Sequence, residues 1–190
     1  MNVLLTGFEA FLDHKTNPTI EIVKALKSPN IDGLILPVEY EHAAQKVNTH
    51  LEKHTYDVVI LLGLAANRSQ ISIEHHAINL MDAKGPDNRG LIKRMEKIDQ
   101  DGPEMVLTGL SFQSIIQHAE HEKRPIELSL SAGAYICNDV FYRVRMVDPE
   151  LKVGFIHVPS LSYIPINEQI EQIKWIVDEI KSLHALAKKR

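Results

Sequence analysis

The chain has 190 residues, of which 44% are hydrophobic and 24% charged, and its formal net charge at pH 7 is −4. These proportions are typical of a globular protein, and the small negative charge provides no basic surface that would favour nucleic-acid binding. No apolar run approaches the length that a membrane-spanning helix needs.

The composition does not shift along the chain, so we expect a single domain covering residues 1–190. Cys137 is the only cysteine, which excludes an intrachain disulfide. The first residues lack the basic region and the cleavage site of a signal peptide. Together these features predict a cytoplasmic protein, in which the short basic run 188–190 is a solvated helix end.

Short apolar or mixed runs predict strands, because continuous apolar runs suit a sheet that is covered on both faces. The predicted strands span residues 3–5, 34–36, 58–62, 71–78, 126–130 and 153–156. Between them lie segments whose apolar residues recur at helical spacing. These predicted helices span residues 17–26, 43–51, 112–119, 134–144 and 166–183. The first has Asn17 as its N-cap and Pro18 at its first position.

Strands that alternate with helices indicate βαβ units, and hence an α/β fold with a mainly parallel sheet and helices on both faces. Ligands in such folds bind beyond the carboxyl ends of strands. We therefore expect site residues after Leu5, after Leu62 and after Leu130. Residues 82–104 are largely polar, with scattered glycine, proline and apolar residues, and predict a long loop or a protruding hairpin.

Cys137 is the candidate nucleophile. Residues 128–138 are typical of a strand, a turn of small residues and the start of a helix, which places Cys137 near a helix N-terminus. The unpaired N–H groups and the dipole of that terminus favour the reactive thiolate by lowering the thiol pKa, and they could stabilise an oxyanion. A lone cysteine is also commonly an inert core residue.

A cysteine nucleophile needs a base and a group that orients the base. Most of the ten histidines lie on predicted helices among charged residues, where solvated positions are expected. His157 instead ends an apolar run and is either a core histidine or a site residue. Glu74 lies in another largely apolar run, where a buried carboxylate would need a partner, although a solvent-facing strand position is also common.

The adjacent histidines His75 and His76 do not suggest a metal site. On one strand their side chains would point to opposite faces, and no cysteine or carboxylate cluster completes a ligand set. We therefore expect no metal.

Four segments resemble motifs of the pyrrolidone-carboxylate peptidases, also called type I pyroglutamyl peptidases, and they occur in that family's order. Residues 130–138, which include Cys137, resemble S-x-A-G-x-[FY]-x-C-[DN]. Residues 71–79, which include Glu74, resemble [LIV]-[ST]-x-E-x-x-A-x-N. His157 lies in a segment similar to F-I-H-[VI]-P, residues 3–11 resemble V-L-L-T-G-F-x-P-F, and Asn17-Pro18 falls at the family's N-P.

The resemblance implies an α/β/α sandwich with a mixed, mainly parallel sheet, and the removal of N-terminal pyroglutamate from peptides. Cys137 would attack the carbonyl that joins pyroglutamate to the next residue. His157 would transfer the proton and Glu74 would orient the imidazole, and water would then hydrolyse the thioester. No metal or organic cofactor is implied. The resemblance also implies a cytosolic homo-oligomer, either a tetramer or a dimer.

For the substrate, the resemblance implies a small apolar pocket. Phe8 and Phe11 would hold the lactam ring between them, although core packing is the alternative for both side chains. The backbone carbonyl of Leu64 would accept a hydrogen bond from the lactam N–H. Tyr135 and Ile136 would line the same pocket.

The chain departs from the family pattern mainly on the substrate side. Lys84 stands where the family has the arginine of D-A-R beside the oxyanion site, and lysine keeps the charge but lacks the planar fork. Gly85 replaces an apolar side chain, and Leu64 replaces glutamine. The family's Gly-Gly-Arg reads Ala66-Asn67-Arg68 here.

Two other functions stay open. One is a related amidohydrolase with a different N-terminal acyl or cyclic-amide specificity. The other is a protein that binds pyroglutamyl peptides without hydrolysing them, which the loss of a triad residue would favour, and none is lost. A nucleoside-phosphorylase-like activity would need a glycine-rich phosphate loop, and the sequence offers none.

Overall fold

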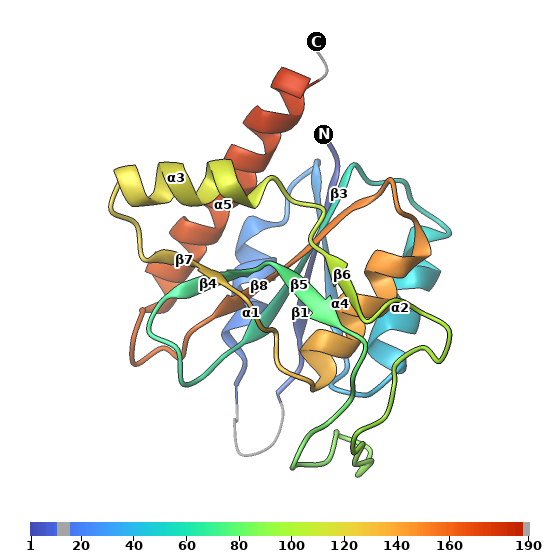
Figure 1. Cartoon of the computed structure of the whole chain (residues 1–190). Helices are drawn as coiled ribbons and strands as arrows, with labels where there is room; N and C mark the ends of the chain where they lie inside the picture. The colour runs from blue at the N-terminus through green and yellow to red at the C-terminus, as the bar shows by residue number, and fades with distance from the viewer. Residues whose placement is uncertain (11–15, 188–190) are drawn as a thin grey trace.

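The computed structural model describes residues 1–10 and 16–187 of the chain. A six-stranded sheet, with strand order β2-β1-β3-β8-β4-β7, lies between two layers of helices (Figure 1). The strands of this sheet are β1 Val3–Phe8, β2 Ile31–Leu36, β3 Val58–Leu64, β4 Ile71–Glu74, β7 Ile126–Ser129 and β8 Lys152–Val158. The predicted α/β fold and its sandwich architecture are therefore confirmed.

The sheet is mixed, as the family resemblance implies. β2, β1, β3 and β8 are parallel, whereas β4 pairs with β8 in the antiparallel direction, with Ser72 opposite His157. β7 is parallel to β4. The reversal has a simple cause: the connection from β3 to β4, residues 65–70, is too short for a crossover helix, so the chain returns in the opposite direction.

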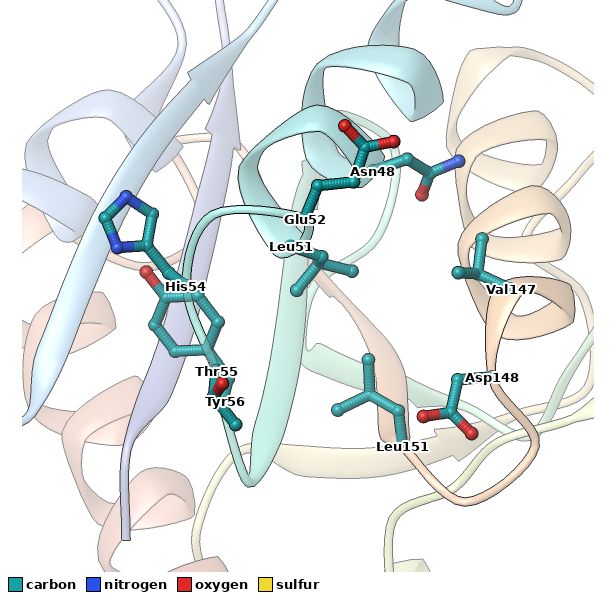
Figure 2. Close-up of a pocket in the computed structure, with 9 residues that line it drawn as sticks. All are labelled: Asn48, Leu51, Glu52, His54, Thr55, Tyr56, Val147, Asp148 and Leu151. Carbon is teal, nitrogen blue, oxygen red and sulfur yellow. The ribbon is translucent and has the colours of Figure 1, made fainter.

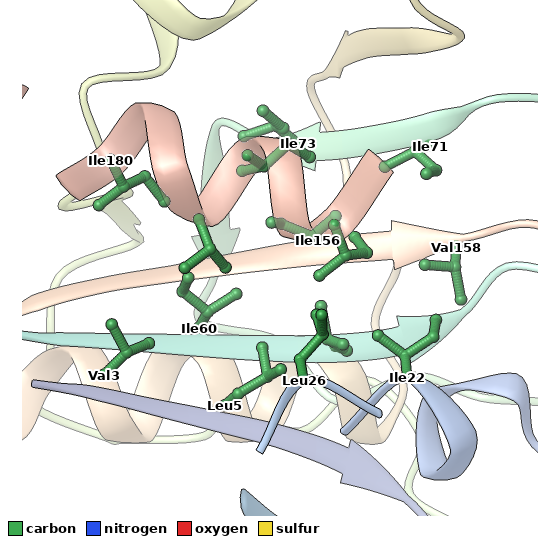
Figure 3. Close-up of a cluster of buried hydrophobic side chains, with 14 of the residues drawn as sticks. Val3, Leu5, Ile22, Leu26, Ile60, Ile71, Ile73, Ile156, Val158 and Ile180 are labelled. Atoms are coloured by element: carbon green, nitrogen blue, oxygen red, sulfur yellow. The ribbon is translucent and has the colours of Figure 1, made fainter. Parts of the chain in front are cut away.

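Two layers of helices cover the two faces of the sheet. The helices are α1 Pro18–Leu26, α2 His42–Leu51, α3 Phe112–His121, α4 Ile136–Val147 and α5 Ile166–Ala187. Buried residues of α1, α3 and α5 pack on one face, and Figure 3 shows part of that cluster around Ile60 and Ile156. Buried residues of α2 and α4 pack on the other face with Leu61 and Phe155.

The start of α1 fixes the end of β1. Asn17 is the predicted N-cap, and its side-chain oxygen accepts hydrogen bonds from the backbone N and the hydroxyl of Thr19 at 3.2 and 2.8 Å. The Thr19 hydroxyl in turn accepts a bond from Phe8 N at 2.9 Å. Gly7 permits this approach, because a Cβ at that position would lie 2.8 Å from Thr19 O.

Two features of the middle of the chain differ from the prediction. The predicted strand 71–78 divides at His75 into β4 and a separate strand, β5 His76–Ile78. β5 pairs with β6, Met105–Leu107, a three-residue strand that carries too little pattern to be predicted. Between β5 and β6 lies the expected long loop, which holds one isolated bridge between Met81 and Glu96.

Across the parts of the chain that the structure describes, none of the helices combines the length and the apolarity that crossing a membrane would require.

The packing predicts a test of the core. Ile60 is fully buried in the central strand β3 (Figure 3), so Ile60→Ala is expected to lower the free energy of unfolding by about 3 kcal/mol in urea denaturation. Leu186→Ala is the control, because Leu186 is 60% exposed and its loss is expected to cost less than about 0.5 kcal/mol. Equal effects of the two substitutions would contradict this description of the core.

Candidate active site

A small apolar pocket lies at the carboxyl end of the parallel strands. Its lining residues are Phe8, Asn17, Val38, Leu64, Tyr135, Ile136 and Cys137. The end of β1, the end of β3 and the segment after β7 therefore meet, at the three places where site residues were expected. The free volume is only about 20 Å³, enough for roughly one water molecule, so a lactam ring can enter only if the lining side chains move apart.

The predicted substrate residues have different positions relative to this pocket. Phe8, Leu64, Tyr135 and Ile136 line it. Lys84 is exposed on the long loop and is not among the lining residues. Two contacts nevertheless hold that loop against the segment before Cys137: Asp82 N donates to Ala134 O at 2.9 Å, and Tyr135 OH donates to Pro86 O at 2.8 Å. Phe11 lies outside the described residues.

His157 and Glu74 form a buried pair beside the pocket. His157 Nδ1 lies 2.7 Å from Glu74 Oε1, and the two side chains are 6% and 0% exposed. They meet because Ser72 on β4 is opposite His157 on β8, and Glu74, two residues further along β4, lies on the same face of the sheet. Since Nδ1 is occupied by the carboxylate, Nε2 is the nitrogen that is left for proton transfer.

Cys137 packs against this same face of the sheet. It lies in the first turn of α4, and its nearest strand residue is Gly63, where a Cβ would lie 3.0 Å from the Cys137 sulfur and 2.7 Å from Phe155 Cζ. Gly63 is also the register partner of His157 in the β3–β8 pair. The missing side chain at Gly63 therefore leaves room for the sulfur against β3, the strand that pairs with the strand of His157, and no hydrogen bond joins Cys137 to His157 within the described residues.

Two contacts fix the start of α4. Gly133 has φ +78°, a conformation that side chains of L-residues rarely adopt, and it turns the chain toward the helix. Asn138 is fully buried and donates to Ile78 O and Leu80 O at 2.8 and 3.0 Å, while its oxygen accepts from Ile78 N. These bonds tie the first turn of α4 to the segment that follows Glu74.

The electrostatic environment favours an ionised Glu74 and a neutral His157. Burial alone raises the pKa of the Glu74 carboxyl, but the hydrogen bond from His157, together with Ser129 and Arg68, outweighs burial and lowers that pKa. Burial lowers the pKa of His157, and Glu74 offsets only part of this effect. The resting imidazole therefore carries one proton, on Nδ1, and can act as a base.

The predicted effect of the helix N-terminus on the thiol pKa of Cys137 has the expected direction, but it is outweighed, so the expected lowered pKa is not found. Burial raises the pKa of Cys137 to about 12, and the negative charge of Glu74 adds to this effect. Arg68 and the backbone N–H of Cys137 oppose the increase without reversing it. The resting nucleophile is therefore a thiol, and it must lose its proton during the reaction.

Sequence analysis missed the functional importance of Gly63 and Arg68. Arg68 donates to Glu74 Oε1 at 2.6 Å and to Ser131 O at 2.8 Å. Its only signal in the sequence is an arginine shortly after the buried strand β3, a position that the altered family motif also marks.

The prediction that His75 and His76 point to opposite faces of a strand is also wrong. β4 ends at Glu74 and β5 begins at His76, so His75 lies outside both strands, and the Nδ1 atoms of the two histidines lie 3.0 Å apart. Within the described ranges, however, no group of three or more histidine, cysteine or carboxylate side chains could hold a metal ion.

A larger surface pocket lies far from this site. It has a volume of about 450 Å³ and opens between the last turns of α2 and α4, as Figure 2 shows around Leu51 and Val147. Val147 is at the opposite end of α4 from Cys137, about 15 Å away at the rise of an α-helix. None of the predicted site residues lines this pocket.

Comparisons with known proteins agree with the resemblance seen in the sequence. Residues 1–180 match the sequence model of the pyroglutamyl peptidase family. The chain is 38% identical over 170 residues to the pyrrolidone-carboxylate peptidase of Lactobacillus acidophilus, which covers 85% of this chain and 84% of that protein. It is 36% identical over 178 residues to the peptidase of that name from Oceanobacillus iheyensis, with 88% of each covered.

Solved structures lead to the same family. The crystal structure of pyroglutamyl peptidase I from Bacillus amyloliquefaciens superposes with a TM-score of 0.85 at 31% identity, covering 91% of this chain and 93% of that one. The pyrrolidone carboxyl peptidase of Fervidobacterium islandicum superposes with a TM-score of 0.86 at 31% identity, covering 96% and 99%.

The raised thiol pKa predicts how alkylation depends on pH. The rate at which iodoacetamide modifies Cys137 is expected to rise about tenfold per pH unit between pH 6 and pH 9, because only the thiolate reacts. Mass spectrometry can measure this rate directly, since the chain has a single cysteine, and Cys137→Ala serves as the blank. A rate that reaches a plateau below pH 8 would show a preformed thiolate and contradict this expectation.

Proposed function

This chain belongs to the pyroglutamyl peptidase family and is a pyroglutamyl-peptidase I hydrolase, and we propose that Cys137, His157 and Glu74 form its catalytic triad. The observation that carries the proposal is the buried 2.7 Å hydrogen bond between His157 and Glu74, on the sheet face that Cys137 packs against. A base held by a buried carboxylate, on the face that also carries the candidate nucleophile, supports the arrangement of nucleophile, base and orienting group that acyl transfer requires.

The first half of the proposed reaction forms a thioester. As the Cys137 sulfur attacks the carbonyl carbon of pyroglutamate, its proton passes to Nε2 of His157, and the Glu74 carboxylate stabilises the imidazolium. Backbone N–H groups at the start of α4 would stabilise the developing oxyanion. His157 then gives the proton to the departing amine, the C–N bond breaks, and the acyl group stays on the sulfur.

The second half releases the product. Water gives a proton to His157 and attacks the thioester carbon, the C–S bond breaks, and the sulfur recovers its proton from the imidazolium. Free pyroglutamate leaves and the thiol and neutral imidazole are restored. This cycle needs a reduced Cys137, which a cytoplasmic location would maintain.

The pocket supports an uncharged N-terminal ring as the substrate group. Its lining is almost entirely apolar, so an ordinary N-terminal ammonium group would lose its hydration without a partner, whereas a lactam carries no charge. We propose that Phe8, Tyr135 and Ile136 contact the ring and that the backbone carbonyl of Leu64 accepts its N–H. We also propose that Phe11 and Lys84 contact the substrate once it is bound.

A related specificity is the second candidate function. Leu64 lines the pocket at the position where the family has glutamine, and Lys84 lies outside the pocket lining. These features favour an amidohydrolase of the same mechanism that accepts other small uncharged acyl groups or cyclic amides.

The proposal predicts hydrolysis of a pyroglutamyl-arylamide by the purified protein. Cys137→Ala is expected to lower kcat/KM by at least about 1000-fold, because no other group replaces the nucleophile. Release of the arylamine, followed by fluorescence, measures the rate. Equal activity of the wild type and Cys137→Ala would exclude the triad mechanism.

A panel of pyroglutamyl, prolyl and N-acetyl arylamides then separates the two candidate specificities. Prolyl-arylamide has the same ring size but a charged amine, so we expect it to react at least about 100-fold more slowly than the pyroglutamyl compound. Faster hydrolysis of the N-acetyl compound than of the pyroglutamyl compound would favour the altered specificity.

Gly63 provides a test of the geometry. A methyl group in Gly63→Ala would displace the Cys137 sulfur or Phe155, and kcat is expected to fall about 100-fold. Gly33→Ala is the matched control, because its Cβ would contact the side chain of Val23 at 2.8 Å on the edge strand β2, away from the triad. Similar activities of the two variants would mean that the sulfur does not depend on the space at Gly63.

A further inference from the structure

The guanidinium of Arg68 connects two parts of the site that come from different elements. Arg68 belongs to the short connection between β3 and β4, where its backbone N donates to Ala65 O in a turn. Nη1 donates to Glu74 Oε1 at 2.6 Å, and Nη2 donates to Ser131 O at 2.8 Å. One planar group therefore joins the triad carboxylate to the segment that leads into Cys137.

The two donors to Glu74 share a single oxygen. Oε1 accepts both from His157 Nδ1 and from Arg68 Nη1, whereas Oε2 is buried and has no hydrogen-bond partner among the described residues. The orientation of the carboxylate therefore depends on these two donors, together with the Ser129 side chain on the neighbouring strand β7. Without Arg68, the Glu74 carboxylate would lose one of the hydrogen bonds that hold its orientation.

Arg68 also completes the charge balance of the buried site. Glu74 is fully buried, and among the described lysine and arginine side chains Arg68 is the one that forms an ion pair with it. With a neutral imidazole, the carboxylate and the guanidinium sum to zero. Without Arg68, the site would hold an uncompensated negative charge, and the nearest group able to neutralise it by taking up a proton is His157.

We propose that Arg68 is a positioning residue for the proposed hydrolysis: by binding Glu74 and Ser131 O, it holds the carboxylate that orients the base and the segment that leads to Cys137 in register. Its positive charge also adds to the effect of burial, which disfavours protonation of His157. The proposal rests on the proposed function, but its effect on His157 is a property of the resting protein. The charged groups that act on His157 are Glu74 from β4 and Arg68 from the β3–β4 connection, and the Cys137 thiol on α4 packs on the same face of the sheet. Of these, Arg68 is the group that opposes protonation by its positive charge.

The direct test is an NMR titration of the His157 ring, assigned by comparison with His157→Gln, in the wild type and three variants. Arg68→Gln is expected to raise the His157 pKa by about one unit, because a cation next to the ring has been removed. Arg68→Lys keeps the cation and is expected to leave the pKa within about 0.3 unit of the wild type. Arg145→Gln is the matched control, since Arg145 also binds backbone carbonyls, those of Leu107, Asp148 and Pro149, at the far end of α4.

Kinetics test the second part of the proposal. Arg68→Lys is expected to lower kcat about tenfold with little change in KM, because one ammonium group cannot bind Glu74 and Ser131 in the same planar geometry. Arg68→Gln is expected to lower kcat about 100-fold and to move the acidic limb of kcat/KM to higher pH.

Each outcome has a defined meaning. A folded Arg68→Gln protein whose His157 pKa is unchanged would overturn the electrostatic role, and an Arg68→Lys protein with full kcat would overturn the positioning role. If Arg68→Gln does not fold, Arg68→Met is titrated in its place under the same criterion. A His157 pKa that shifts in a protein without pyroglutamyl-arylamide hydrolysis would support the electrostatic role of Arg68 and reject the proposed function.

Discussion

The buried carboxylate of Glu74 is the constraint on which the rest of the site depends. A fully buried carboxylate is costly unless charged or hydrogen-bonded partners compensate it, and here His157 and Arg68 bind the same oxygen. These partners come from β8 and from the connection before β4. Folding can bury Glu74 only when those elements are correctly placed, so the stability of this part of the fold and the geometry of the site have the same origin.

The reversed direction of β4 makes this arrangement possible. Antiparallel pairing with β8 sets Ser72 opposite His157 and so brings Glu74 to the face that α4 covers. After Glu74 the chain leaves the main sheet, and Asn138 binds the backbone of the departing segment at Ile78 and Leu80. The segment that follows Glu74 therefore also binds the first turn of the helix that carries Cys137.

The pocket beside the triad is closed by its own side chains. Its small volume and apolar lining exclude charged groups, and the bond from Tyr135 OH to Pro86 O holds one wall against the long loop. A ring that enters must separate Tyr135 from its neighbours, which couples substrate entry to the loop that carries Lys84. Two departures from the family pattern, Lys84 and Gly85, lie on this loop, whereas the proposed triad is complete.

Local pattern alone determined where the helices and most strands lie, because the spacing of apolar residues and the caps act over a few positions of the chain. It also marked Cys137, His157 and Glu74 as candidates, and their likeness to family motifs joined them into one hypothesis. Only the tertiary structure decided their environment. His157 and Glu74 are 83 positions apart, and their contact depends on strand order and direction, which no local spacing encodes.

The thiol pKa illustrates the same division. The helix N-terminus at Cys137 is a local feature and was visible in the sequence, but burial against Gly63 and Phe155 and the charge of Glu74 outweigh it. His75 and His76 likewise lie together because the predicted strand is interrupted at His75, and Arg68 reaches Glu74 because a short connection turns back. The burial and the charge environment of a residue depend on which distant parts of the chain lie near it. The fold therefore decided these two properties, and the residues adjacent in the sequence did not.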